Sequence, residues 1–184
     1  MALSQTVEAR LARLEAESQI RRIIARYTFD IDDRNIAAVR ALFTPDAVVR
    51  SHDGVMMAKG VDALIDQYHG RFKALGAGMH VMHDVDITFE SETTARGRVS
   101  GHAEVWRNGA HMLTGLRYYD RYELWDGSWR FAEREINHLY YVAAEDYVGI
   151  LGVTDRNRAY ATPKPADFPE ARDSWQAYEA AYPR

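Results

Sequence analysis

The sequence predicts an α+β domain in which three N-terminal helices cover a curved antiparallel sheet. The apolar residues recur at helical spacing as far as residue 75 and at a spacing of two from residue 79 onward. Asn108-Gly109 and Asp126-Gly127, which are typical of two-residue hairpin turns, separate three long stretches of strand character. Three long strands joined by two tight turns form an antiparallel meander, and such a sheet twists and curls. The front helices are then available to cover its concave face.

The helical part of the chain divides into three segments. Apolar residues at helical spacing predict a first helix over residues 4–33, and the polar cluster that follows interrupts it. A short second helix is expected over 36–43, ended by Pro45, because the residue before a proline avoids the helical region. The third helix is expected over 61–75, closed by the glycines that follow it.

The remaining elements are predicted as strands. Residues 47–50 and 55–58 form a small hairpin around the turn signature His52-Asp53-Gly54. Alternating apolar and polar residues then predict four long strands over 79–89, 94–106, 110–125 and 128–142.

We expect residues 1–142 to form one domain and residues 143–184 to form an extension. The extension interleaves prolines with tyrosine, phenylalanine and tryptophan. It is too aromatic for a disordered tail and too rich in proline for another central strand. We therefore expect it to pack on the domain or on a neighbouring subunit.

Composition excludes several classes of function. The chain has 184 residues, 47% of them hydrophobic, and no cysteine, which excludes disulfides, cysteine-ligated metals and a thiol nucleophile. No apolar run is long enough to span a membrane. The net charge is −4 with acids and bases interleaved, so no basic surface for nucleic acid is indicated. The N-terminus lacks the pattern of a signal peptide, and we expect a cytoplasmic protein.

Known cofactor and nucleophile motifs are also absent from the sequence. It contains no phosphate-binding GxxxxGK, no GxGxxG after a strand, no HExxH and no GxSxG. We therefore expect neither a metal nor an organic cofactor.

Asp32 and His80 are the first candidates for catalysis. An acid at the C-terminal end of a helix faces the unfavourable end of the helix dipole, so stability alone does not explain Asp32 there, although it is also suited to cap the second helix. His80 opens the first long strand, and imidazole is suited to proton transfer near neutral pH. His83 lies three residues further on, so the two rings point to opposite faces of a regular strand and are not expected to share a metal.

The last strand is polar on both faces. Arg134, Ile136, His138 and Tyr140 share one face, and Glu133, Glu135 and Asn137 share the other. A strand that covers a solid core does not have this pattern. We expect either a pocket lined by donors and acceptors or a surface ladder of ion pairs.

Other residues are expected to contribute to the walls of such a pocket. Phe29, Trp106 and Tyr118 are candidate apolar walls, although the sequence does not fix the direction of their side chains. His102 is a weaker candidate, because the alternation of its strand directs it away from the more apolar face.

Four stretches of the sequence carry a resemblance to a known family: IRRIIARYTFDIDDRN, ALFTPDAVV, GMHVMHDVDITFE and GLRYYDRYELWDGSWRFAERE. With the order of the elements, they resemble the SnoaL-like branch of the nuclear transport factor 2 superfamily over roughly residues 15–142. This branch includes scytalone dehydratase, bile acid dehydratase and hexachlorocyclohexane dehydrochlorinase. The resemblance implies a cone-shaped, cystatin-like fold.

The resemblance also implies roles for particular residues. Active enzymes of this branch keep an aspartate at the end of the first helix and a histidine that opens the first long strand, which match Asp32 and His80. A tyrosine five residues before the aspartate matches Tyr27, and an arginine after the WDGSWRFAER tryptophan matches Arg134. His102 is the nearest counterpart of a polar residue on the middle strand.

These observations together lead to an expected function. We expect a cofactor-independent lyase for a small apolar cyclic or aromatic compound, in which Asp32 orients His80 and His80 abstracts a proton. Tyr27, Arg134 or His138 would bind the substrate's oxygen. The leaving group would be water, a halide or, by a retro-aldol route, an aldehyde.

Two other classes of function stay open. An isomerase or polyketide cyclase would use the same dyad, and a non-catalytic binding protein or oxygenase β subunit would need none. Homo-oligomers are expected because relatives assemble through the outer face of the sheet, and a trimer is preferred to a dimer.

Overall fold

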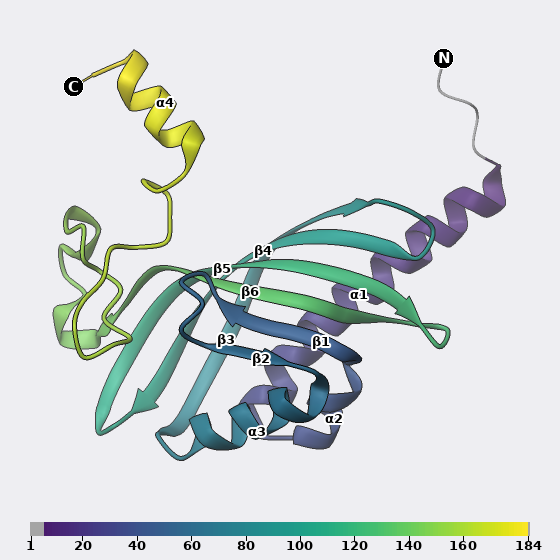
Figure 1. Cartoon of the computed structure of the whole chain (residues 1–184), viewed down its shortest axis with the longest axis horizontal. Helices are drawn as coiled ribbons and strands as arrows, with labels where there is room; N and C mark the ends of the chain where they lie inside the picture. Colours follow the sequence, from purple (N-terminus) through teal and green to yellow (C-terminus); the bar gives the residue numbers. More distant parts are fainter. Residues whose placement is uncertain (1–5, 184) are drawn as a thin grey trace.

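The computed structural model describes residues 6–183 and confirms the expected α+β fold. One curved six-stranded sheet has the order β2-β1-β6-β5-β4-β3, and helices pack on one of its faces (Figure 1). The strands are β1 (Phe43–Ser51), β2 (Met57–Lys59), β3 (Leu75–Phe89), β4 (Thr94–Arg107), β5 (Ala110–Trp125) and β6 (Ser128–Ala143). The helices are α1 (Val7–Asp32), α2 (Ile36–Ala41), α3 (Val61–Phe72) and α4 (Asp173–Ala181), with short 3₁₀ helices η1 (Ala144–Asp146) and η2 (Ile150–Gly152). Among residues 6–183, no helix is both long and apolar enough to cross a membrane.

Several predicted boundaries are corrected by the structure. Residues 4 and 5 of the expected first helix lie outside the described part of the chain. The helix expected over 36–43 ends at Ala41, and Pro45 lies inside β1 instead of terminating a helix. The register between β1 and β6 shifts between Phe43 and Val48, so the proline falls where its missing N–H disrupts no regular pairing.

The start of the long sheet also differs from the prediction. The third helix ends at Phe72, and β3 begins at Leu75. Gly76 and Gly78 therefore belong to the strand and do not close the helix. A Cβ on Gly76 would lie 2.9 Å from the Trp106 ring, so the glycine provides the space in which that ring lies.

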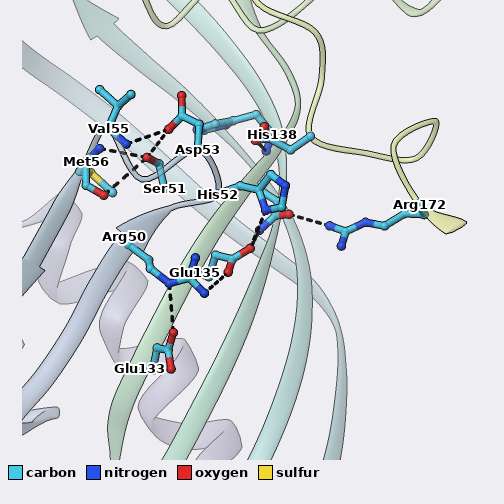
Figure 2. A network of polar contacts seen from close by, with 12 residues as sticks. Arg50, Ser51, His52, Asp53, Val55, Met56, Glu133, Glu135, His138 and Arg172 are labelled. Atoms are coloured by element: carbon cyan, nitrogen blue, oxygen red, sulfur yellow. Dashed lines mark hydrogen bonds and ion pairs between the residues drawn. The ribbon is translucent and has the colours of Figure 1, made fainter.

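The two faces of β6 serve different purposes. On one face, Arg50 of β1 makes ion pairs with Glu133 and Glu135, and His52 lies 2.8 Å from Glu135 (Figure 2). The opposite face points under the helices. The ladder of ion pairs and the pocket-facing surface that the sequence left as alternatives therefore both occur, on opposite sides of one strand.

A bulge in β6 reverses the alternation near its end. Leu116 pairs with His138 and Gly115 pairs with Tyr140, which leaves Leu139 as an extra residue. As a result Tyr140 packs over Gly115 on the outer face, and Tyr141 takes the inner face. The prediction that Tyr140 shares a face with Arg134 and His138 is wrong, because the inserted residue shifts the alternation of side chains by one position.

A buried ion pair joins the centres of β5 and β6. The Arg134 guanidinium donates from Nε and Nη2 to the Asp120 carboxylate at 2.9 and 2.7 Å, and both side chains are fully buried. The Tyr122 hydroxyl donates to the same carboxylate at 2.8 Å. The Arg134 cation also lies 4.1–4.3 Å from the centres of the Tyr27, Tyr118 and Phe131 rings.

Residues after β6 cover an edge that β1 leaves open. β1 ends at Ser51 beside Ile136, so the following residues of β6 have no strand on that side. The Asp167 carboxylate accepts from the His138 amide at 2.7 Å, and the Tyr141 amide donates to the Arg156 carbonyl at 2.9 Å.

Arg156 holds this covering segment together. Its buried guanidinium donates to the carbonyls of Leu139, Val153 and Phe168 and to the Glu170 carboxylate. Beyond this segment, α4 stands away from the sheet (Figure 1).

The buried ion pair yields a stability prediction. Asp120→Ala leaves the Arg134 cation buried without its anion, and we expect a loss of about 3–5 kcal/mol in the free energy of unfolding. Asp86→Ala removes an exposed partner of Arg98 and should cost under about 1 kcal/mol. Urea denaturation monitored by circular dichroism measures both values. Equal costs for the two variants would contradict the structural role of the buried pair.

Candidate functional site

A cavity of about 690 Å³ lies between the inner face of the sheet and the helices. Its walls come from α1, α3, the β1–β2 hairpin, strands β3 to β6 and the segment after β6. At the other end of the sheet the space under α1 is filled by apolar side chains, including Ile24, Phe43, Tyr122 and Phe131. The fold therefore places a solid core and a ligand-sized cavity side by side under one sheet.

Asp32 and His80 meet at the cavity wall. Asp32 is the last residue of α1, and His80 lies on β3. One oxygen of the carboxylate lies 2.6 Å from His80 Nδ1, and the other accepts the His80 backbone N–H at 2.8 Å. Both side chains are about four-fifths buried. Because the carboxylate holds both the ring and its backbone, the imidazole is fixed in orientation.

The contacts of the dyad determine which ring nitrogen is available. A carboxylate accepts a hydrogen bond from Nδ1–H, so in the neutral imidazole the lone pair resides on Nε2. His80 lines the cavity. The pair therefore presents an oriented nitrogen base to whatever the cavity holds.

Three tyrosines provide hydroxyl groups in the same cavity. Tyr27 and Tyr68 lie hydroxyl to hydroxyl at 2.8 Å, and Tyr118 is buried beside Tyr27. Burial, with the neighbouring Tyr27 hydroxyl, raises the pKa of both Tyr68 and Tyr118 well above the ordinary value. These phenols stay protonated at neutral pH, so they are hydrogen-bond donors suited to a developing negative charge.

His138 lies on the cavity wall as a neutral imidazole. Burial, reinforced by the positive charges of Arg71 and Arg107, lowers its pKa to about 4. The Thr114 hydroxyl donates to the Tyr140 carbonyl at 2.8 Å and lies 3.0 Å from His138 Nδ1. The hydroxyl hydrogen is thus engaged, so Nδ1 is the donor and Nε2 keeps a lone pair.

The structure brings most of the predicted site residues together. Tyr27, His80, Tyr118 and His138 line the cavity, and Asp32 contacts it through His80. Arg134 does not line it. The guanidinium lies behind the Tyr27 and Tyr118 rings, paired with Asp120, so it positions the phenols and does not reach a ligand.

Three predicted wall residues lie outside the cavity. Phe29 is 70% exposed, because it lies two residues, about 200° of helical rotation, from the buried Tyr27. Trp106 is on the outer face of β4, where it covers Gly76. His102 also points outward, and its Nδ1 lies 2.8 Å from Nε2 of His83. These three residues are corrected to surface positions.

Sequence reasoning missed several residues of the cavity wall, among them Tyr68, Arg71, Arg107 and Thr114. Arg107 continues the inward alternation of Ala103 and Val105, and Arg71 lies one helical turn after Tyr68. The spacing therefore indicated that both arginines face inward. They were not predicted as wall residues because an element that covers a core is expected to direct apolar side chains inward.

Comparison with known proteins agrees with this architecture. Residues 12–135 match the family model described as a SnoaL-like domain. A scytalone dehydratase candidate from Novosphingobium aromaticivorans is 22% identical, with a TM-score of 0.70 over 88% of this chain and 97% of that one. A hexachlorocyclohexane dehydrochlorinase from Novosphingobium barchaimii is 18% identical, with a TM-score of 0.67 over 72% and 92%.

A third solved structure has a name of a different kind. The β subunit of a candidate aromatic-ring-hydroxylating dioxygenase from N. aromaticivorans is 22% identical, with a TM-score of 0.59 over 70% of this chain and 91% of that one. At these identities the likeness shows a shared fold.

The neutral state of His138 predicts a pH dependence of stability. The unfolded imidazole takes up a proton below about pH 6.5, whereas the folded one does so only near pH 4. The free energy of unfolding should therefore fall by roughly 2–3 kcal/mol from this group alone between pH 7 and pH 4.5. His138→Gln should remove this part of the decline in urea titrations at the two pH values. His69→Gln changes an exposed imidazole on α3 and should leave the decline as in the wild type. If the free energy of unfolding of His138→Gln declined as much as that of the wild type, His138 would not be buried in its neutral form.

Proposed function

Because the chain belongs to the SnoaL-like domain family, we propose that it is a cofactor-independent lyase for a small, largely apolar cyclic or aromatic compound. The observation that carries this proposal is the Asp32–His80 dyad at the wall of the cavity. An imidazole held by a carboxylate at two points and directed into a partly apolar cavity is an arrangement suited to general-base catalysis.

In the proposed reaction His80 Nε2 removes a proton from a carbon next to the bond that breaks. The electron pair of that C–H bond forms a new C=C bond, and the leaving group departs with the electrons of its own bond. Asp32 accepts the hydrogen bond of Nδ1–H and stabilises the imidazolium that forms. The Tyr118 hydroxyl and one hydroxyl of the Tyr27–Tyr68 pair, whose other hydrogen is used between the two rings, donate to the substrate oxygen on which negative charge develops.

The remaining walls support an apolar ring as the body of the substrate. Val105, Leu116 and Ile136 cover the sheet side, and Phe72 closes the helix side. A cavity of about 690 Å³ is in the range that holds drug-sized ligands. The dehydratase and dehydrochlorinase that share the fold are named for the loss of water and of hydrogen chloride, and both are eliminations of the proposed kind.

The dyad also suits an isomerase or cyclase, in which the proton is returned elsewhere on the same molecule. The mass of the product separates the two classes, because only a lyase releases a fragment. A non-catalytic role like that of a dioxygenase β subunit requires no oriented base, so the dyad geometry favours an enzyme.

The base can be tested without knowing the natural substrate. 5-Nitrobenzisoxazole opens to a coloured phenolate when a base removes its ring C–H proton and the N–O bond breaks, so it reports any positioned base in an apolar cavity. We expect the wild-type protein to accelerate this reaction, and His80→Gln to lose about 10²–10⁴-fold of that acceleration. Asp32→Asn should also lose most of the rate, because the amide N–H can donate to Nδ1 and thereby leave the ring hydrogen on Nε2, the nitrogen that must act as the base.

A matched control is available on the surface. His111 lies 3.4 Å from Glu104 but outside the cavity. His111→Gln therefore removes a histidine paired with a carboxylate and should leave the rate unchanged. Thermal denaturation of each variant checks that it is folded. A folded His80→Gln protein as fast as the wild type would overturn the proposal.

A further inference from the structure

The charged side chains that line the cavity directly are all of one sign. Lys59, Arg71 and Arg107 line the cavity, and no aspartate or glutamate is among the described residues that do. The chain as a whole has 27 acidic residues and 23 basic ones, so this local excess of positive charge opposes the overall balance. A cleft lined by one sign of charge attracts ligands of the other sign.

Within residues 6–183, neither cavity arginine has a carboxylate partner. Arg71 donates to the Met56 sulfur at 3.0 Å, which is a weak acceptor, and Arg107 lies over the Tyr141 ring at 5.3 Å. Arg50 and Arg134, by contrast, are paired with acids. The planar forks of Arg71 and Arg107 are therefore available to a ligand.

Both arginines lie at the same end of the cavity, because the Asn108 amide donates to the Ala74 carbonyl and the Ala74 amide donates to the Arg71 carbonyl, which brings the end of α3 beside Arg107. Their charges each contribute to lowering the pKa of His138, which also lines the cavity. Asp53, which acts on His138 in the other direction, is already paired with Lys164 at 2.7 Å and bonded to the Tyr160 hydroxyl. The positive charge of the two arginines is thus not neutralised by that acid.

The pairing of the strands separates Arg107 from the base. Arg107 pairs with Leu75 at the end of the β3–β4 ladder. His80 pairs with Ala103, which lies four residues before Arg107 on β4. At about 3.3 Å per residue the two positions lie roughly 13 Å apart along the strand. An anion at Arg107 and a reacting carbon at His80 therefore fit the two ends of one ring-containing molecule.

We propose that the substrate carries a carboxylate, bound by Arg71 and Arg107 at the end of the cavity remote from His80. A carboxylate suits this site because a guanidinium binds its two coplanar oxygens through parallel hydrogen bonds. The position of the reacting carbon rests on the proposed function, whereas the carboxylate subsite is a matter of binding alone. The ligand class is an aromatic or alicyclic carboxylic acid in its ionised form.

The test compares matched anionic and neutral probes by isothermal titration calorimetry on the full chain. The pairs are benzoate with benzamide, cyclohexanecarboxylate with cyclohexanecarboxamide, and 2-naphthoate with 2-naphthamide. We expect the carboxylate of at least one pair to bind about tenfold or more tightly than its amide. Arg71→Gln and Arg107→Gln should each abolish most of this preference and leave binding of the amide unchanged.

Two controls make the result specific. Arg22→Gln removes the same charge from an exposed position on α1 and should keep the preference, while His80→Gln should keep it and still lose base catalysis. Loss of the preference in Arg22→Gln equal to that in Arg71→Gln would assign the effect to net charge and overturn the subsite. Failure of every carboxylate to bind better than its amide would also overturn it. Either outcome leaves the dyad to be judged separately by the 5-nitrobenzisoxazole reaction.

Discussion

The ion pair between Arg134 and Asp120 is the interaction on which the rest of the structure depends. It joins the two central strands, β5 and β6. The aromatic rings of Tyr27 from α1, Tyr118 and Phe131 lie around its cation. A buried charge without its partner is strongly unfavourable, so both strands are fixed relative to one another and to α1. The phenols that face the cavity are positioned by the same group.

This arrangement explains how one sheet supports both a core and a cavity. Near the ion pair the sheet is covered by packed aromatic and aliphatic side chains, and further along β6 the inner face becomes His138 and Tyr141. At that point β1 has ended. The backbone groups on the open edge of β6 form hydrogen bonds instead with Asp167 and Arg156 from the segment after the sheet. Ala159 and Tyr160 of this segment then complete the cavity wall.

Electrostatics divide the cavity into regions with different chemistry. At the Asp32–His80 end, a carboxylate and an imidazole are joined by a hydrogen bond. The neighbouring phenols stay protonated because burial raises the pKa of Tyr68 and Tyr118, and His138 stays neutral because burial and nearby arginines lower its pKa. The arginine end is cationic. The proposed base, the phenol donors and the proposed anion site thus occupy separate positions around one apolar space.

The sequence by itself determined the elements, because helical and alternating periodicity follow directly from which residues face the core. It also named Asp32, His80 and Tyr27 as candidates, since the resemblance matched them by position, and in the structure Asp32 contacts His80 while His80 and Tyr27 line the cavity. The direction of Tyr140 and the surroundings of Arg134, Arg71 and Arg107 were decided only by the tertiary structure. One inserted residue at Leu139 reverses a strand's alternation, and a polar side chain belongs to a core or a cavity depending on partners from distant elements. Those partners meet only when the chain is folded.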